Sequence, residues 1–233
     1  MTNALANLNV SLPSATSTDM AAFEAVAKGS SFLPRIQLIT KGKYVDTGKI
    51  SPGHWGVPQP GGEEIQDLGD KVDVIPFAFR PKAMDVSDRE AIVTSYDVND
   101  PEFKRIVAAP KNTGCIWGPT FLVFERNTQK FYELFFSNAS GRSEASKMRP
   151  FLPSEENEGL PSAASMGIRY KQTKDYGWHV PVITKCTLTF DSIPPGEKIL
   201  EVIEAFNTQS GGVEKVDESK ENKDEGKASK RAR

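Results

Sequence analysis

The chain has 233 residues, of which 38% are hydrophobic and 26% charged, and its net charge is −2. This length suits one domain with flanking tails, and such a domain can fold without disulfide staples. The charge balance argues against a protein coated in positive charge, although a basic groove on an acidic surface remains compatible with it. No apolar run approaches the roughly 20 residues that span a bilayer, so no membrane partner is expected.

The compartment is indicated by the N-terminal residues and the cysteines. Met1–Ala6 has no basic stretch of the kind that opens a secretory signal. Cys115 and Cys186 are the only cysteines, too few for a disulfide scaffold. We therefore expect a cytoplasmic protein with reduced thiols.

The two ends differ in composition from the middle. Residues 1–31 are rich in Ala, Ser, Thr and Asn, which predicts disorder apart from a short helix near 19–28. Residues 208–233 form a charged tail, in which the segment 213–226 holds six acids against three lysines and the segment after it is basic. One β-rich domain is expected between the two disordered ends, over residues 32–207.

Strand patterns dominate the middle of the chain, together with two Gly/Pro-dense loops at 51–62 and 153–161. Alternating or apolar runs predict strands at 71–80, 91–96, 121–126, 130–136, 167–174, 178–184 and 187–190. The polar residues 127–129 and 175–177 separate neighbouring runs, which predicts two hairpins.

Helix signals are fewer. Asp100 and Pro101 form an N-cap and a first helical position, which predicts a helix over 100–108. A second helix is expected at 143–151, and a third at 195–207, where apolar residues repeat at helical spacing. The predicted fold class is mainly β (β-rich α+β): an OB-like small barrel with short helices and a C-terminal amphipathic helix.

Catalytic and metal-binding patterns are weak. His54, His179, Cys115 and Cys186 could form a tetrahedral zinc site, but they lack the closely spaced ligand pairs of structural zinc sites. The sequence has neither a nucleophile elbow nor a Walker phosphate loop. We therefore expect no enzyme activity, no metal and no cofactor.

Aromatic and basic residues occur together in the predicted hairpins. Bases of a single strand stack on aromatic faces while Lys and Arg track the phosphates. In the 167–174 strand, Arg169 and Lys171 share one face and Tyr170 lies on the other. The candidate nucleic-acid-binding residues are Arg80, Lys82, Arg142, Lys147, Arg149, Arg169, Tyr170, Lys171, Lys174, Tyr176 and Trp178.

Core packing is the alternative explanation for the aromatic residues. Most of the phenylalanines at 121, 131, 135 and 136 must fill the interior of a barrel of this size. The tyrosines and Trp178 are better candidates for a surface, because their polar edges tolerate water.

Several strings resemble a family of small conserved proteins encoded by tailed bacteriophages. They are Phe32–Leu38, Asp67–Gly69, Arg80–Ala83, Gly114-Cys115 with Gly118-Pro119, and Trp178–Pro181. The resemblance spans residues 32–207 and implies a phage setting, with the host cytoplasm as the location, and no particular chemistry.

Two functions from different classes follow. The first is a non-catalytic, phage-type single-stranded DNA-binding protein that supports DNA replication or recombination, with the acidic segment 213–226 binding partner proteins. The second is a virion structural or assembly protein that uses the same aromatic surface as a protein interface. Homo-oligomerisation is left open by both.

Overall fold

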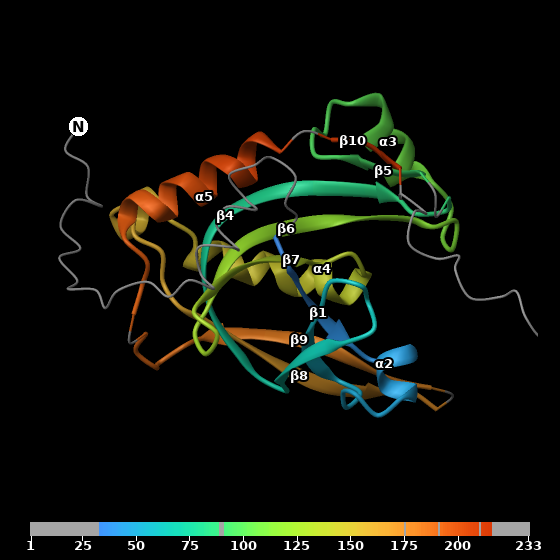
Figure 1. Ribbon diagram of the computed structural model, residues 1–233, viewed down its shortest axis with the longest axis horizontal. Helices are drawn as coiled ribbons and strands as arrows, with labels where there is room; N and C mark the ends of the chain where they lie inside the picture. Colours follow the sequence, from blue (N-terminus) through green and yellow to red (C-terminus); the bar gives the residue numbers. More distant parts are fainter. Residues whose placement is uncertain (1–32, 89–90, 175, 191, 210, 216–233) are drawn as a thin grey trace, which may run out of the picture.

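The computed structural model describes residues 33–88, 91–174, 176–190, 192–209 and 211–215 (Figure 1). These residues form a mainly β fold, a curled half-barrel sheet with a few short helices, which confirms the predicted fold class. In chain order the elements are β1 (Arg35–Ile39), α2 (Lys43–Asp46), β2 (His54–Pro58), β3 (Ile65–Gly69), β4 (Val72–Asp85), β5 (Ala91–Ser95), α3 (Pro101–Ala108), β6 (Cys115–Glu125), β7 (Lys130–Phe135), α4 (Ala139–Ala145), the 3-10 helices η2 (Ser146–Phe151) and η3 (Glu155–Asn157), β8 (Ala164–Gln172), β9 (Gly177–Lys185), α5 (Gly196–Thr208) and β10 (Gly212–Lys215).

The long strand β4 organises the sheet. It pairs antiparallel with β6 along most of its length. Its other edge pairs with β8 at residues 72–74 and with β5 at residues 83–85. The main path of the sheet is β10-β5-β4-β6-β7-β1-β2-β3, with β9 joined to β8, and β1 runs parallel to β7. β4 therefore connects the β8–β9 hairpin, at the bottom of Figure 1, to the β5 region at the upper right.

Helix α5 covers one face of the sheet, which we call the α5 face (Figure 1). Its buried residues Ile199, Val202 and Phe206 pack with apolar side chains from β4 and β6. The predicted C-terminal amphipathic helix is thereby confirmed, and its apolar stripe docks on the sheet as the spacing indicates.

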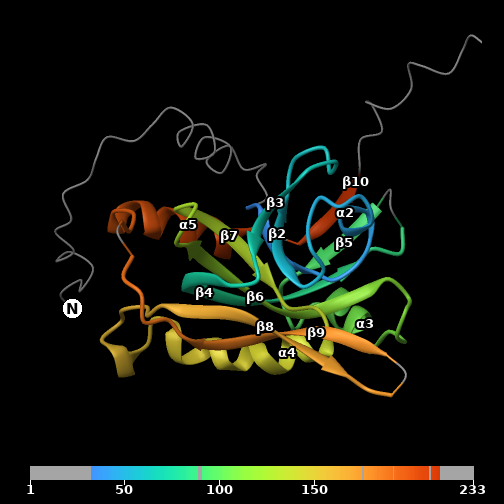
Figure 2. The same ribbon diagram turned by 90° about the horizontal axis from the view of Figure 1, so that it is seen from below.

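The opposite face holds the larger apolar core. Trp55 from β2, Tyr132 from β7 and Met148 from η2 are buried there together with residues of β6 and β8. Helix α4 packs against β9 on this side, as Figure 2 shows. The β8–β9 hairpin is thus anchored by its base, while its turn projects from the body in both views.

Local signals located several elements well. Asp100 accepts a hydrogen bond from the backbone N–H of Glu102 and caps α3, which confirms the predicted helix over 100–108. The hairpins β6–β7 and β8–β9 are also confirmed. The helix expected at 143–151 is two consecutive helices, α4 and η2, because Asn138 caps α4 by accepting a hydrogen bond from Gly141 N–H.

Other predictions are wrong. The stretch 51–62, expected to be an irregular loop, contains β2, whose Trp55 is 1% exposed. Residues 187–190 form no strand. The predicted tail from residue 208 includes β10, whose backbone pairs antiparallel with β5. The expected helix near 19–28 and the expected disorder of residues 1–31 and of residues beyond 215 lie outside the described residues.

No helix among the described residues is both long enough and apolar enough to cross a membrane.

Candidate nucleic-acid interface

The β8–β9 hairpin carries the largest group of predicted site residues. Its ladder runs from Ala164 opposite Lys185 to Gln172 opposite Gly177. The turn is closed by Thr173, whose N–H donates to the carbonyl of Tyr176 at 2.8 Å and whose hydroxyl donates to the same oxygen at 3.0 Å. These bonds fix the hairpin end, so the side chains around it are held by a regular backbone rather than by a loose loop.

The hairpin register assigns the candidate residues to its two faces. Residues directly opposite each other in an antiparallel pair project to the same face. Lys171 is opposite Trp178, and Arg169 follows two positions away on the same face. This face, which we call the basic face of the hairpin, combines two cations and an indole ring.

Tyr176 and Trp178 form an aromatic pair at the end of the hairpin. Their ring centroids are 5.3 Å apart with an interplanar angle of 35°. Tyr176 is 66% exposed and Trp178 is half-buried. This tilted contact steadies both rings and leaves the outer surface of Tyr176 accessible. A planar base can stack there without any rearrangement of the backbone.

Tyr170 lies on the other face of the hairpin, opposite His179. The two rings are 5.1 Å apart, and Tyr170 is 56% exposed. Its ring crosses Gly177, where an added Cβ would lie only 1.8 Å from the phenolic oxygen. His179 in turn packs on Gly53, where an added Cβ would meet the imidazole at 2.7 Å. Tyr170 is therefore held with His179 and separated from the Tyr176–Trp178 pair by the backbone.

His179 and Thr173 are contributors to the site that the sequence does not single out for this role. His179 enters the sequence reasoning only as a metal ligand. The hairpin register places His179 opposite Tyr170, on the face that does not carry Arg169 and Lys171. Thr173 is the turn residue that holds Tyr176 in place.

The three cationic side chains of α4 and η2 differ in how far they are already engaged by other protein groups. Arg142 donates to the backbone carbonyls of Trp117 and Ser137, and its guanidinium lies 3.9 Å from the Trp117 ring centroid. Lys147 pairs with Glu144 at 2.8 Å. Arg149 is exposed on η2, which packs against β9. Of these three, Arg149 is the best placed to contact a phosphate. The contacts of Arg142 with Trp117 instead link α4 to β6.

Arg80 and Lys82 do not extend the hairpin surface, and the prediction that they line an exposed groove is wrong. Arg80 is 7% exposed and Lys82 is 0% exposed. Both project to the α5 face of β4, because Arg80 is paired with Thr120 and lies beside Phe206 of α5. The alternation of β4 turns these cations inward.

The metal and thiol candidates are scattered. Within the described ranges, no three His, Cys, Asp or Glu side chains gather in a way that could hold a metal ion. His54 instead pairs with Asp67, with 3.0 Å between its Nδ1 and the nearer carboxylate oxygen. Cys115 and Cys186 are free thiols.

Comparison of the chain with models of known protein families, with curated proteins and with solved structures gives no match.

Proposed function

We propose that the protein binds single-stranded nucleic acid, most directly single-stranded DNA, through the end of the β8–β9 hairpin. The observation that carries the proposal is the exposed Tyr176–Trp178 pair with Lys171 directly across the ladder from Trp178. Aromatic rings beside cations are the elements that bind single strands without sequence preference.

The charge of the hairpin supports the same proposal. Between residues 164 and 186 the sequence has one acidic residue, Asp175. The basic residues in the same stretch are Arg169, Lys171, Lys174 and Lys185. A net charge of +3 on the hairpin of a chain whose total is −2 concentrates positive potential at one end of the molecule. A polyanion is attracted there although the protein as a whole is slightly acidic.

The proposed mechanism is non-catalytic. One or two bases stack on the Tyr176–Trp178 pair, while Arg169, Lys171 and Lys174 contact consecutive phosphates. Duplex DNA does not offer unstacked bases, so the arrangement favours single strands. A phage setting, a location in the host cytoplasm, a role in replication or recombination, and partner binding by the segment 213–226 belong to the same proposal.

Variants of the hairpin separate stacking from phosphate contacts. Tyr176→Ala and Trp178→Ala are each expected to weaken binding to a labelled oligothymidylate by about 1–3 kcal/mol, with the salt dependence unchanged. Lys171→Ala is expected to reduce the magnitude of the slope of log K against log salt by about 0.7, the value for one lost phosphate contact on a single strand. Fluorescence anisotropy titrations at several salt concentrations measure both quantities.

A cation outside the hairpin is the matched control. Lys104 is exposed on α3, and Lys104→Ala should leave both affinity and slope unchanged. Thermal melting of every variant identifies any loss of binding that comes from unfolding, which matters for the half-buried Trp178. Equal effects of Lys104→Ala and Lys171→Ala would contradict a localised site at the hairpin.

A further inference from the structure

The α5 face of the sheet changes from apolar to charged along β4. Beneath α5 it is apolar, with Phe77, Leu122 and Phe124 in the core. Further along, the register aligns Arg80 with Thr120 of β6 and aligns Thr120 with Phe135 of β7. The residues that gather there, which we call the charged cluster, are Arg35, Arg80, Lys82, Thr120 and Glu133.

Positive charge exceeds negative charge in this cluster. Lys82 Nζ is 2.7 Å from Glu133 Oε1, and Arg35 Nε is 3.1 Å from the same oxygen. Arg80 adds a third cation. Among the described residues, Glu133 is the carboxylate whose negative charge attracts it. Three positive charges and one negative charge leave a net of +2 on side chains that are largely removed from water. Such an excess favours binding of an anion.

Buried donors in the cluster also lack acceptors. Arg80 Nε and Thr120 Oγ1 are buried, and neither has a hydrogen-bond partner among the residues that the structure describes. The two terminal nitrogens of Arg80 donate to Gln209, and the guanidinium lies over the Tyr96 ring, 3.5 Å from its centroid. Arg80 is therefore fixed in place while its Nε has no acceptor among the described residues. Lys82 donates a hydrogen bond to Glu133, and an ammonium can make three.

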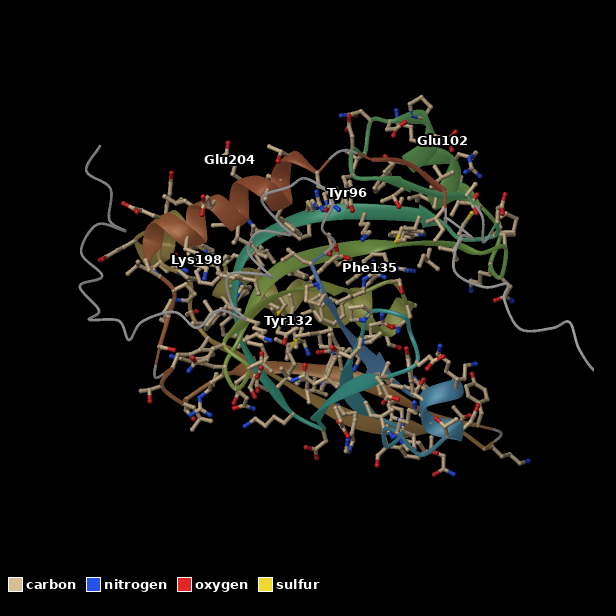
Figure 3. All side chains as sticks on the ribbon, viewed as in Figure 1. Tyr96, Glu102, Tyr132, Phe135, Lys198 and Glu204 are labelled. Carbon is tan, nitrogen blue, oxygen red and sulfur yellow. The ribbon has the colours of Figure 1, made fainter. Side chains whose placement is uncertain are left out.

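The rim of the cluster is more open than its floor. Arg80, Lys82, Thr120 and Glu133 are all buried. Arg35, Tyr96 and Phe135 around them are partly exposed. Figure 3 labels Tyr96 and Phe135, which flank β4 and β6 from the two sides.

We propose that the charged cluster is a recessed binding site for a phosphate dianion, either inorganic phosphate or a phosphate monoester. A dianion balances the net charge of the cluster, whereas a carboxylate would balance half of it. Arg80 Nε, Lys82 Nζ and the Thr120 hydroxyl are donors that a tetrahedral oxyanion can accept from together. This site lies on the α5 face and does not rest on the proposed function of the hairpin.

The titration of Lys82 is consistent with this site. Burial lowers the pKa of Lys82 to about 8, and the attraction of Glu133 opposes that shift only in part. A dianion beside the ammonium would raise this pKa again, because an opposite charge favours the protonated form. The Lys82 amine is therefore expected to be held in its protonated form when the dianion is bound.

Calorimetric titration of the full chain with sodium phosphate, against sodium chloride at matched ionic strength, tests the proposal. We expect saturable phosphate binding that chloride does not reproduce. Thymidine monophosphate and thymidine are the further probes. Binding of the monophosphate shows that a monoester enters the site, phosphate binding alone restricts the site to the free ion, and thymidine should not bind there.

Two variants locate the site. Lys82→Met removes the charge at similar length and should weaken phosphate binding by about tenfold or more, the worth of a charge-assisted hydrogen bond. Thr120→Val keeps the shape of the side chain and removes an unpartnered hydroxyl, so it should remain folded and bind phosphate several-fold more weakly. If Lys82→Met does not fold, phosphate binding by Thr120→Val tests the proposal instead.

Lys147→Met, which changes an exposed lysine on η2, should bind phosphate as the wild type does. Trp178→Ala should do so as well, so failure of the hairpin proposal and failure of this one are distinguishable. Phosphate that binds no better than chloride would overturn the proposal. So would unchanged phosphate binding in a folded Lys82→Met, or in Thr120→Val where Lys82→Met does not fold.

Discussion

Replacing Glu133 with Ala is expected to lower the free energy of unfolding by about 3–5 kcal/mol, the range for removing one partner of a buried ion pair. Glu133 is 4% exposed and accepts from both Lys82 and Arg35. Without its carboxylate, the buried Lys82 loses the compensating charge that the described part of the chain places beside it. Urea unfolding followed by circular dichroism measures the change.

An exposed ion pair gives the control for this prediction. Glu64 pairs with Lys49 at 2.6 Å, but its side chain is 70% exposed. Glu64→Ala should cost no more than about 1 kcal/mol, because solvent screens such pairs. Similar losses in the two variants would contradict the view that burial makes Glu133 important.

The pH dependence of stability provides a second signature of Glu133. Burial alone would raise the pKa of Glu133, but the attraction of Lys82 and Arg35 outweighs it and lowers the pKa below its ordinary value of 4.5. A lowered folded-state pKa means that the stabilisation is present above the unfolded-state pKa and is lost as pH falls through the folded-state value. The unfolding free energy of the wild type should therefore decline in acid more steeply than that of Glu133→Ala.

Phe206→Ala is the second substitution with a large expected effect, a loss of about 3–5 kcal/mol for a buried phenylalanine cut to alanine. Phe206 is 3% exposed and its ring lies 4.2 Å from the Arg80 guanidinium carbon. The substitution removes apolar packing between α5 and the sheet, together with one of the rings that hold Arg80. Urea unfolding of the variant measures the loss.

Leu200, on the same helix, is the control because it is 48% exposed. Leu200→Ala should change the unfolding free energy by less than about 1 kcal/mol, as expected for a surface position. If Phe206→Ala were as mild as Leu200→Ala, α5 would not be part of the cooperative core.

Local sequence signals were sufficient for the elements whose causes are local. Asp100 and Pro101 mark the start of α3 because a cap and a fixed φ act within one turn. The β8–β9 hairpin follows from two alternating runs around a short polar turn. The apolar stripe of α5 follows from helical spacing. None of these requires knowledge of a distant partner.

Features that depend on distant partners could not be predicted. β2 lies in a Gly/Pro-dense stretch, and it is a strand because it pairs with β1 and β3 and buries Trp55. The parallel pairing of β1 with β7 joins segments about a hundred residues apart and has no local signature.

The candidate site shows the same division. The strand period predicts that Arg169 and Lys171 share a face. The register that places Trp178 with them, and Tyr170 with His179, is a cross-strand property. Lys82 resembles a surface lysine in sequence and is buried because Glu133, on another strand, pairs with it.

Titration of the wild-type protein with single-stranded and duplex DNA of the same sequence, at a low and a moderate salt concentration, tests the central claim most directly. We predict binding to the single strand at low salt, weaker binding to the duplex, and a loss of single-strand affinity with salt that corresponds to a slope of about −0.7 per phosphate contact. Failure to bind the single strand even at low salt would contradict the account, and the exposed Tyr176–Trp178 pair would then be better explained as a protein interface.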